Sequence, residues 1–232
     1  MCGRFTLTQS VQQLATHFRL EKEPQFVPGY NIAPNQPVPV IRAGKTTQRM
    51  FDYMYWGLIP SWSKDSSISA RLINARSETV TEKASFRTAF KRRRCLVAAD
   101  GFYEWQQSAT KKTGTKKQPF YFHLQEHQPF GFAGLWETWY NPEGDETVSC
   151  TILTTTANAQ MQPIHDRMPV ILKPDDYDLW LDPAVQSPDH ILPLLRPFPA
   201  EEMQHYPVST LVNNPSHDSP DCLVPLEESE LS

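Results

Sequence analysis

Short apolar runs, separated by polar and proline-containing segments, set the strongest limit on how this chain can fold. They have the length and residue content of β-strands and lie at residues 38–42, 50–58, 95–99, 102–106, 119–124, 131–138, 148–155, 168–172 and 207–212. Helical patterns are few and scattered, at residues 10–20, 79–92 and 175–181. The chain has 21 prolines and 9 glycines, which indicates many irregular connections. Together these patterns predict a mixed α+β fold rather than a doubly wound sheet.

Charge is distributed unevenly along the chain of 232 residues. Residues 1–120 hold 19 Lys and Arg against 8 Asp and Glu, whereas residues 121–232 hold 3 against 18. The net charge of the whole chain, -4, taken alone argues against a nucleic-acid binder. The uneven distribution leaves two alternatives open: the basic part has an anionic partner, or the two parts attract each other within one fold.

Several classes of protein are disfavoured by what the sequence lacks. No apolar run approaches the roughly 18 residues of a membrane-spanning helix, and the first five residues lack the pattern of a secretory signal. The four cysteines, Cys2, Cys95, Cys150 and Cys222, form no CxxC or CxxH pair. We therefore expect no metal site, no membrane contact and a reducing, cytoplasmic location, associated with the nucleoid if the protein is bacterial.

Cys2 differs from the other cysteines because it follows Met1 directly. Removal of Met1 would place an α-amine, with an ordinary pKa of about 7.7–8.0, beside a thiol of pKa about 8.5. Such a 1,2-aminothiol captures aldehydes: the amine forms a Schiff base, and the thiol then closes a thiazolidine ring. An internal cysteine cannot react in this way. The alternative is a small buried residue whose position is accidental.

Glu104 and His165 are candidates for proton transfer. Glu104 lies within the aromatic run Phe102–Trp105, and a carboxylate that shares a core or cleft has a raised pKa. If the strand simply alternates, Glu104 faces water instead. His165 is followed by Asp166 and Arg167, which could orient its imidazole for proton transfer near pH 7. A lone histidine in a structural role is the alternative.

Asn74 and Arg76 are two positions apart. On a strand their side chains would lie on the same face, an arrangement suited to binding a phosphate. A helix start capped by Ser77 is the alternative interpretation.

These residues fall within ordered blocks that resemble the SRAP family of SOS-response-associated peptidases, or abasic-site-processing proteins. The matching blocks are 1–5 (MCGRF), 30–34 (YNIAP), 56–62 (WGLIPSW), 73–78 (INARSE), 100–105 (DGFYEW) and 164–169 (IHDRMP). The resemblance implies a single SRAP domain over residues 1–216, followed by an acidic, loose tail over residues 217–232. It also implies a mostly antiparallel, curved, barrel-like β core with peripheral helices and a basic DNA-binding groove. The candidates for this groove are the basic residues Arg71, Arg76, Arg87, Lys91, Arg92, Arg93 and Arg94. For residues 91–94, an ordinary solvated helix end is the alternative.

The resemblance implies a covalent reaction with abasic sites in single-stranded DNA. Cys2 inherits the role of the nucleophile that forms a thiazolidine with the ring-opened sugar, and the cross-link shields the site from strand cleavage. Glu104 corresponds to the residue that assists proton transfer at the cysteine amine. His165 corresponds to the residue for sugar ring opening and cross-link reversal, and Asn74 to one that positions the sugar.

The resemblance also implies how DNA is held and which side reactions occur. Arg4 and Arg76 correspond to phosphate contacts, and Trp62 to a base-stacking or wedging residue. Some relatives carry two adjacent tryptophans here, whereas Trp62 is followed by Ser63. Weak strand-cleaving lyase activity and self-removal of Met1, the origin of the peptidase label, belong to the same expectation.

Two other functions remain as alternatives. The first is a cysteine peptidase that uses Cys2 as its nucleophile and His165 as its base. The second is a noncovalent single-strand binder. None of these functions requires a cofactor, and we expect a monomer.

Overall fold

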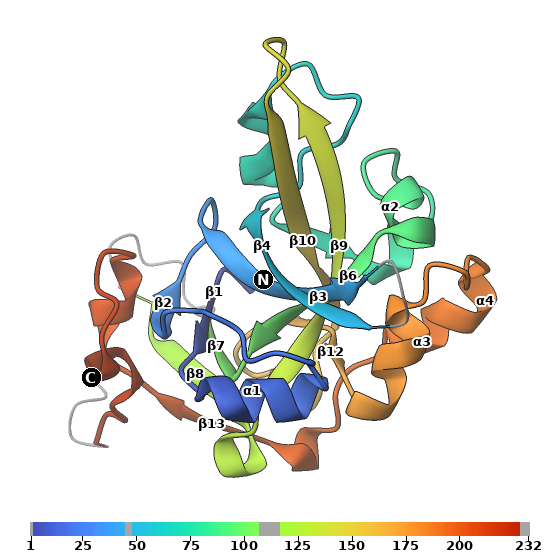
Figure 1. Cartoon of the computed structure of the whole chain (residues 1–232). Helices are drawn as coiled ribbons and strands as arrows, with labels where there is room; N and C mark the ends of the chain where they lie inside the picture. Colours follow the sequence, from blue (N-terminus) through green and yellow to red (C-terminus); the bar gives the residue numbers. More distant parts are fainter. Residues whose placement is uncertain (1, 45–47, 107–116, 228–232) are drawn as a thin grey trace.

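Two β-sheets pack against each other in the computed structural model, which describes residues 2–44, 48–106 and 117–227 (Figure 1). The first sheet is antiparallel, in the order β13-β8-β7-β1-β2. Its strands are β1 (Arg4–Leu7), β2 (Gly29–Ile32), β7 (Gly101–Trp105), β8 (Pro119–Leu124) and β13 (Met203–Pro207).

The second sheet closes on itself. Its strands are β3 (Pro37–Ala43), β4 (Arg49–Trp56), β5 (Asn74–Arg76), β6 (Arg94–Ala99), β9 (Phe130–Tyr140), β10 (Glu146–Thr156), β11 (Arg167–Pro169) and β12 (Ile171–Leu172). Strand pairing runs β10-β4-β3-β6-β9 and returns from β9 to β10, which makes a ring. The pairings of β10 with β4 and β5 are parallel and the others are antiparallel. The predicted mixed, mostly antiparallel, barrel-like architecture is therefore confirmed.

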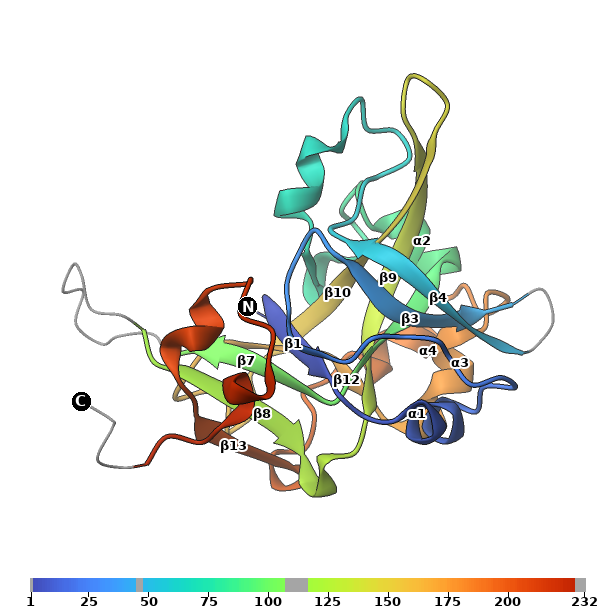
Figure 2. The same cartoon turned by 60° about the vertical axis from the view of Figure 1, so that its left-hand side comes forward.

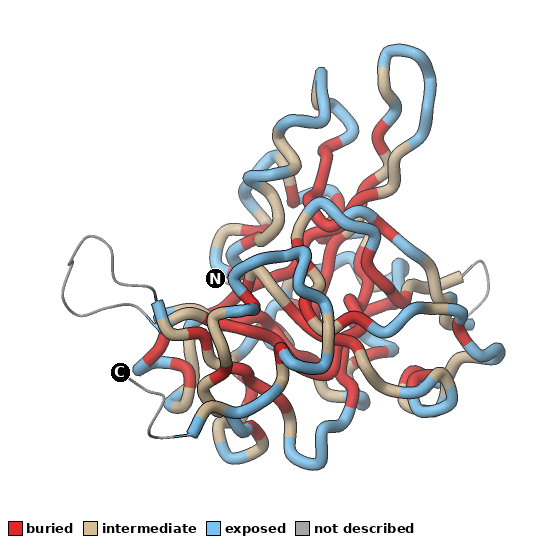
Figure 3. The backbone as a smooth tube through the Cα atoms, turned by 90° about the vertical axis from the view of Figure 1, so that its left-hand side faces the viewer, coloured by how far each residue is buried: buried red, intermediate tan, exposed pale blue. Residues whose placement is uncertain are grey.

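The core between the two sheets contains aromatic side chains from both. Phe5 of β1 lies 5.3 Å from Trp56 of β4, and Phe102 of β7 stacks on Phe122 of β8 at 5.2 Å between ring centroids. Cys2 is buried in the same cluster. Figure 3 shows the buried positions gathered in the interior of the molecule, with the exposed positions on the outer loops. The N-terminus is thus anchored in the core between the sheets.

Four helices lie around the sheets within the described residues: α1 (Val11–Phe18), α2 (Arg87–Arg92), α3 (Tyr177–Leu181) and α4 (Pro188–Ile191). α1 begins as its sequence indicates, because Ser10 and Gln13 form a capping box and Leu14 and Phe18 face the core. The expected helix at 175–181 is confirmed as α3.

The predicted helix over residues 79–92 is wrong for its first half. Thr79 accepts hydrogen bonds from the backbone of Glu82 and Lys83, and a separate turn leads into α2. Val80 and Phe86 are both buried. Six residues apart, they would point to different faces of a continuous helix. Separate turns allow both side chains to reach the core.

The C-terminal segment packs on the first sheet instead of leaving the domain. The last strand, predicted at 207–212, is β13 at Met203–Pro207, and 3-10 helices follow at Thr210–Asn213 and Pro220–Leu223. Asp218 accepts hydrogen bonds from the backbone of Tyr30 and Asn31 at the edge of β2, whose N–H groups would otherwise lack partners in the sheet. Figure 2 shows this segment, in red, beside the N-terminus. Residues 217–227 of the expected loose tail are therefore packed, and residues 228–232 lie outside the described part.

Candidate active site

Glu104 lies next to the N-terminal strand. β1 pairs with β7 so that Arg4 is opposite Tyr103 and Phe5 is opposite Phe102. One step further along this register, Gly3 is opposite Glu104. Glu104 shares the face of β7 that carries Phe102, and it is only 3% exposed. The alternative in which Glu104 faces water is therefore wrong.

The side chain of Asn74 is hydrogen-bonded to Cys2, the first residue that the structure describes. β5 pairs with β10, with Asn74 opposite Ile152, and the side chain Nδ2 of Asn74 donates to the carbonyl oxygen of Cys2 at 2.8 Å. Its Oδ1 is buried and makes no hydrogen bond within the described residues. Asn74 thus fixes the backbone of Cys2 and offers a buried acceptor beside it.

The Cys2 thiol is fully buried. Burial, and then the nearby negative charge of Glu104, raise the pKa of this thiol far above its ordinary value. Its Sγ has one weak contact, 3.8 Å from the carbonyl oxygen of Arg4. The thiol is therefore held in its neutral form, and Cys2, Asn74 and Glu104 form one group.

His165 lies in an open pocket of ≈ 620 Å³ that Arg76 also lines. Its Nδ1 accepts a hydrogen bond from the backbone N–H of Arg167 at 3.0 Å and lies 3.0 Å from a carboxylate oxygen of Asp166. β5 connects this pocket with the Cys2 group, because Asn74 and Arg76 are its two ends. The strand interpretation of these two residues is confirmed, and the 3-10 helix begins after them at Ser77.

The Glu78–Arg167 pair stabilises this pocket. The guanidinium of Arg167 binds both carboxylate oxygens of Glu78, at 2.6 and 2.9 Å, and donates to the carbonyl oxygen of Thr154 at 2.7 Å. The hydrogen bonds from Arg167 lower the pKa of Glu78. The sequence had indicated Arg167 only as a neighbour able to orient His165. No local sequence pattern indicates that Arg167 pairs with Glu78, because the two residues are 89 positions apart.

Arg4 is directed toward the C-terminal segment. Its Nη1 donates to Asn31 Oδ1 at 2.9 Å and to the carbonyl oxygen of Val212 at 2.7 Å. Asn31 in turn donates to the carbonyl oxygens of Val212, Asn214 and His217. Arg4 therefore braces the C-terminal segment against β1, and its phosphate contact stays a prediction.

Trp62 is carried by an arm, residues 59–72, that contains the 3-10 helix Ser66–Arg71. The side chain of Trp62 is 60% exposed. The arm rests on the β9–β10 hairpin, because Trp139 Nε1 donates to the Ser63 carbonyl oxygen at 2.8 Å and Ser61 Oγ to Glu137 at 3.5 Å. Arg93 pairs with the same carboxylate at 2.6 Å. Trp62 is thus presented to solvent from an anchored arm.

The basic residues proposed for a groove separate into two kinds. The side chains of Arg71, Arg76, Arg87, Lys91 and Arg92 are exposed. Arg94 is only 3% exposed, and its guanidinium donates to the carbonyl oxygens of Phe90, Lys91, Trp180, Asp182 and Val185. The prediction of Arg94 as a groove residue is wrong, because the side chain is buried and its donors are used by five backbone carbonyl groups of the protein itself.

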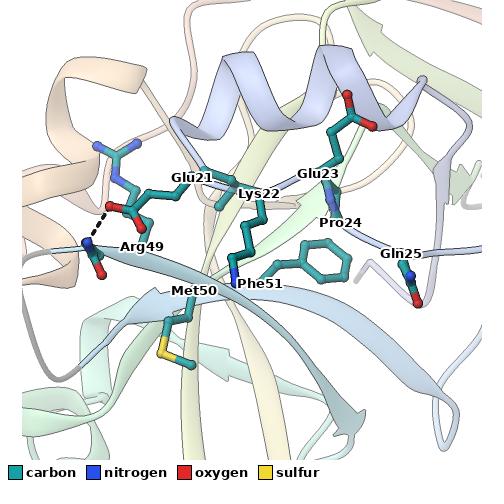
Figure 4. A pocket seen from close by; sticks show the side chains of 10 residues that line it. Glu21, Lys22, Glu23, Pro24, Gln25, Arg49, Met50 and Phe51 are labelled. Carbon is teal, nitrogen blue, oxygen red and sulfur yellow. Dashed lines mark hydrogen bonds between the residues drawn. The ribbon is translucent and has the colours of Figure 1, made fainter.

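Another pocket, of ≈ 430 Å³, lies between residues 20–25 and β4 (Figure 4). Glu21, Glu23 and Lys22 line it together with Met50 and Phe51, and Glu21 accepts a hydrogen bond from Gln48. It contains none of the predicted site residues. The carboxylates of Glu21 and Glu23 offset the positive charges of Lys22 and Arg49, so the pocket offers no excess positive charge to a phosphate backbone.

The described residues contain no group of three or more His, Cys, Asp or Glu side chains able to hold a metal ion. Within the same part of the chain, no helix is long and apolar enough to cross a membrane.

Known proteins are similar to this chain over most of its length. The abasic site processing protein YoqW of Bacillus subtilis is 42% identical over 226 residues, covering 96% of this chain and 99% of that protein. The abasic site processing protein HMCES of Gallus gallus is 34% identical, covering 89% of this chain and 68% of that protein. A crystal structure of a Bacteroides thetaiotaomicron protein superposes with a TM-score of 0.85 at 25% identity, covering 97% of this chain and all of that one. Residues 1–215 match the SOS response associated peptidase (SRAP) family. The chain therefore belongs to the SRAP family.

Proposed function

We propose that this protein recognises abasic sites in single-stranded DNA and captures them covalently through Cys2. The observation that carries the proposal is the grouping of Cys2 with Asn74 and Glu104, at the second position of the chain. The names of the relatives at 42% and 34% identity, abasic site processing proteins, support the same substrate.

The proposed reaction has two covalent steps. After loss of Met1, the neutral α-amine of Cys2 attacks the C1′ aldehyde of the opened sugar, and water leaves to give an imine. The thiol then adds to the imine carbon, and its proton passes to the nitrogen, which closes a thiazolidine. A thiol held neutral suits this order, because the amine reacts first.

Four residues support these steps in the proposal. Glu104 accepts the proton that the amine loses, and Asn74 holds the Cys2 carbonyl so that the amine faces the sugar. His165 opens the sugar ring and assists reversal of the cross-link. Arg76, exposed in the wall of the His165 pocket, binds a phosphate beside the reacting sugar.

Two side reactions belong to the same proposal. Self-removal of Met1 would expose the reactive amine, and an intact mass should then lack that residue. The imine can also undergo β-elimination, which gives weak strand cleavage that ring closure suppresses.

The test uses a single-stranded oligonucleotide whose one uracil has been removed by uracil glycosylase. Protein with a confirmed Cys2 N-terminus should give a heat-stable adduct on a denaturing gel. Cys2→Ala and protein with an uncleaved N-terminal tag should give none. The proposal is wrong if confirmed protein gives no adduct, or if the tagged protein cross-links equally well.

A further inference from the structure

A pocket of ≈ 320 Å³ lies beneath the Trp62 arm, apart from the residues assigned above. The end of β4, the turn after β2, the 3-10 helix Ser66–Arg71 and the turn end of the β9–β10 hairpin surround it. Its walls include Tyr55, Trp139, Asn35, Ser66, Ser69 and Thr147. This volume is at the lower end of small-ligand pockets.

Two aromatic side chains form part of this wall. Tyr55 is 50% exposed, so a large part of its ring is open to a ligand. Trp139 is 7% exposed and its Nε1 is bonded to the Ser63 carbonyl oxygen, which fixes the indole under the arm. An exposed ring beside a fixed one is suited to stacking a planar group.

Polar groups complete the wall. The side-chain amide of Asn35 and the hydroxyls of Ser66, Ser69 and Thr147 belong to residues that line the pocket. An amide and hydroxyls together supply both donors and acceptors. The edge of a nucleobase presents the same mixture, whereas a purely apolar ligand would leave these groups unused.

The pocket adjoins the surface proposed to bind DNA. The arm that covers it carries exposed Trp62, and Lys64 and Arg71 are exposed on the same arm, with Asp65 as the opposing charge. In Figure 2 the arm, the turn between β2 and β3 and the N-terminus border the same side of the molecule. A strand that reaches Cys2 can therefore pass this pocket.

We propose that the pocket beneath the Trp62 arm binds a nucleobase of the captured strand, near its abasic position, with the base stacked on Tyr55. This inference rests on the proposed binding of abasic single strands. A base next to an abasic position has lost one stacking neighbour, and an aromatic side chain in a protein can replace that contact.

The test measures noncovalent affinity, so that it does not depend on the covalent step. Each single-stranded oligonucleotide of a series carries a central tetrahydrofuran, which is an abasic analogue without an aldehyde. Each also carries a second abasic spacer, which removes one further base and is placed one position further along in each member of the series. With the unsubstituted protein, the spacer should weaken binding by about 5- to 100-fold at one position close to the analogue.

Tyr55→Ala should abolish that position-specific loss, and Tyr55→Phe should keep it. Tyr53→Ala is the matched control, because Tyr53 lies two residues away on β4 and is 42% exposed, outside the pocket. Its profile should match that of the unsubstituted protein. A melting temperature for each variant establishes that it is folded.

A profile with no position that depends on Tyr55 would overturn this inference. So would equal weakening of every oligonucleotide by Tyr55→Ala. Either result leaves the adduct assay with true abasic DNA unaffected, so failure here is distinguishable from failure of covalent capture.

Discussion

The sequence shows that Arg94 is a cation but does not reveal its structural role. This residue follows Lys91, Arg92 and Arg93 in the sequence, and a run of four cations is usually a solvated surface. In the structure it is buried, and burial lowers its pKa to about 10, which still leaves it charged at neutral pH. Its donors join the end of α2 to the end of α3.

Arg94→Ala should lower the free energy of unfolding by about 2–4 kcal/mol, because five carbonyl groups near the ends of α2 and α3, two of them in buried hydrogen bonds, lose a charged donor. Urea unfolding measures this effect. Arg92→Ala removes an exposed cation nearby and should change the same quantity by less than about 0.5 kcal/mol. Equal effects from the two substitutions would contradict the structural role of Arg94.

His17 gives a prediction about pH. Its Nε2 lies 3.1 Å from the Tyr177 hydroxyl, and burial, with Arg49 nearby, lowers the pKa of His17 from 6.5 to about 4. The unfolded chain therefore binds more protons than the folded chain between these two pH values. Stability from the neutral imidazole is present above pH about 6.5 and is lost as pH falls toward about 4.

The melting temperature of the unsubstituted protein should accordingly fall more between pH 7 and pH 4 than that of His17→Gln, which cannot titrate. Scanning calorimetry at the two pH values measures the difference. Parallel changes in both proteins would show that His17 does not contribute.

At the scale of elements, the strands were predictable and their partners were not. Short apolar runs predict most strands, and the Asn74–Arg76 segment is a strand, as one of its two interpretations requires. The ring of β3, β4, β6, β9 and β10 depends on pairing between segments far apart in sequence, which local patterns do not contain. The contacts of Asp218 with Tyr30 and Asn31 are also long-range, so the sequence predicts a loose tail where the structure has a packed segment.

The candidate site was predictable to a similar degree. Cys2, Asn74 and Glu104 lie in sequence blocks at 1–5, 73–78 and 100–105, and the sheets place them together. Nothing in the sequence distinguishes Tyr55 as a binding residue. Tyr55 belongs to a strand whose exposed tyrosines look alike in sequence, and only the arm that folds over one of them makes a pocket.

At the scale of the molecule, the total charge is a poor guide to DNA binding. Arg76 and the arm come from the basic part of the chain, whereas His165 comes from the acidic part, so the site uses both. Strand pairing within the second sheet brings these parts together, because β10 pairs with both β5 and β11. The exposed cations, not the sum of all charges, decide the interaction with a phosphate backbone.

Affinity for a single strand containing tetrahydrofuran should therefore fall as salt is raised, with a slope of roughly 0.7 in log–log form per phosphate contact. Arg76→Ala should reduce that slope by about 0.7. Arg196→Ala removes an exposed arginine of the acidic part and serves as the control. If Arg76→Ala leaves the slope unchanged, Arg76 does not contact a phosphate.

The most direct test of the account is the intact mass of the adduct between the protein and abasic DNA, before and after borohydride treatment. A thiazolidine has no reducible imine, so we expect the adduct of the unsubstituted protein to form without borohydride and keep its mass when treated. Cys2→Ser keeps the amine but lacks the thiol, and it should give a stable adduct only when borohydride traps the imine. If the unsubstituted protein also needs borohydride to form a stable adduct, capture through the Cys2 thiol is contradicted.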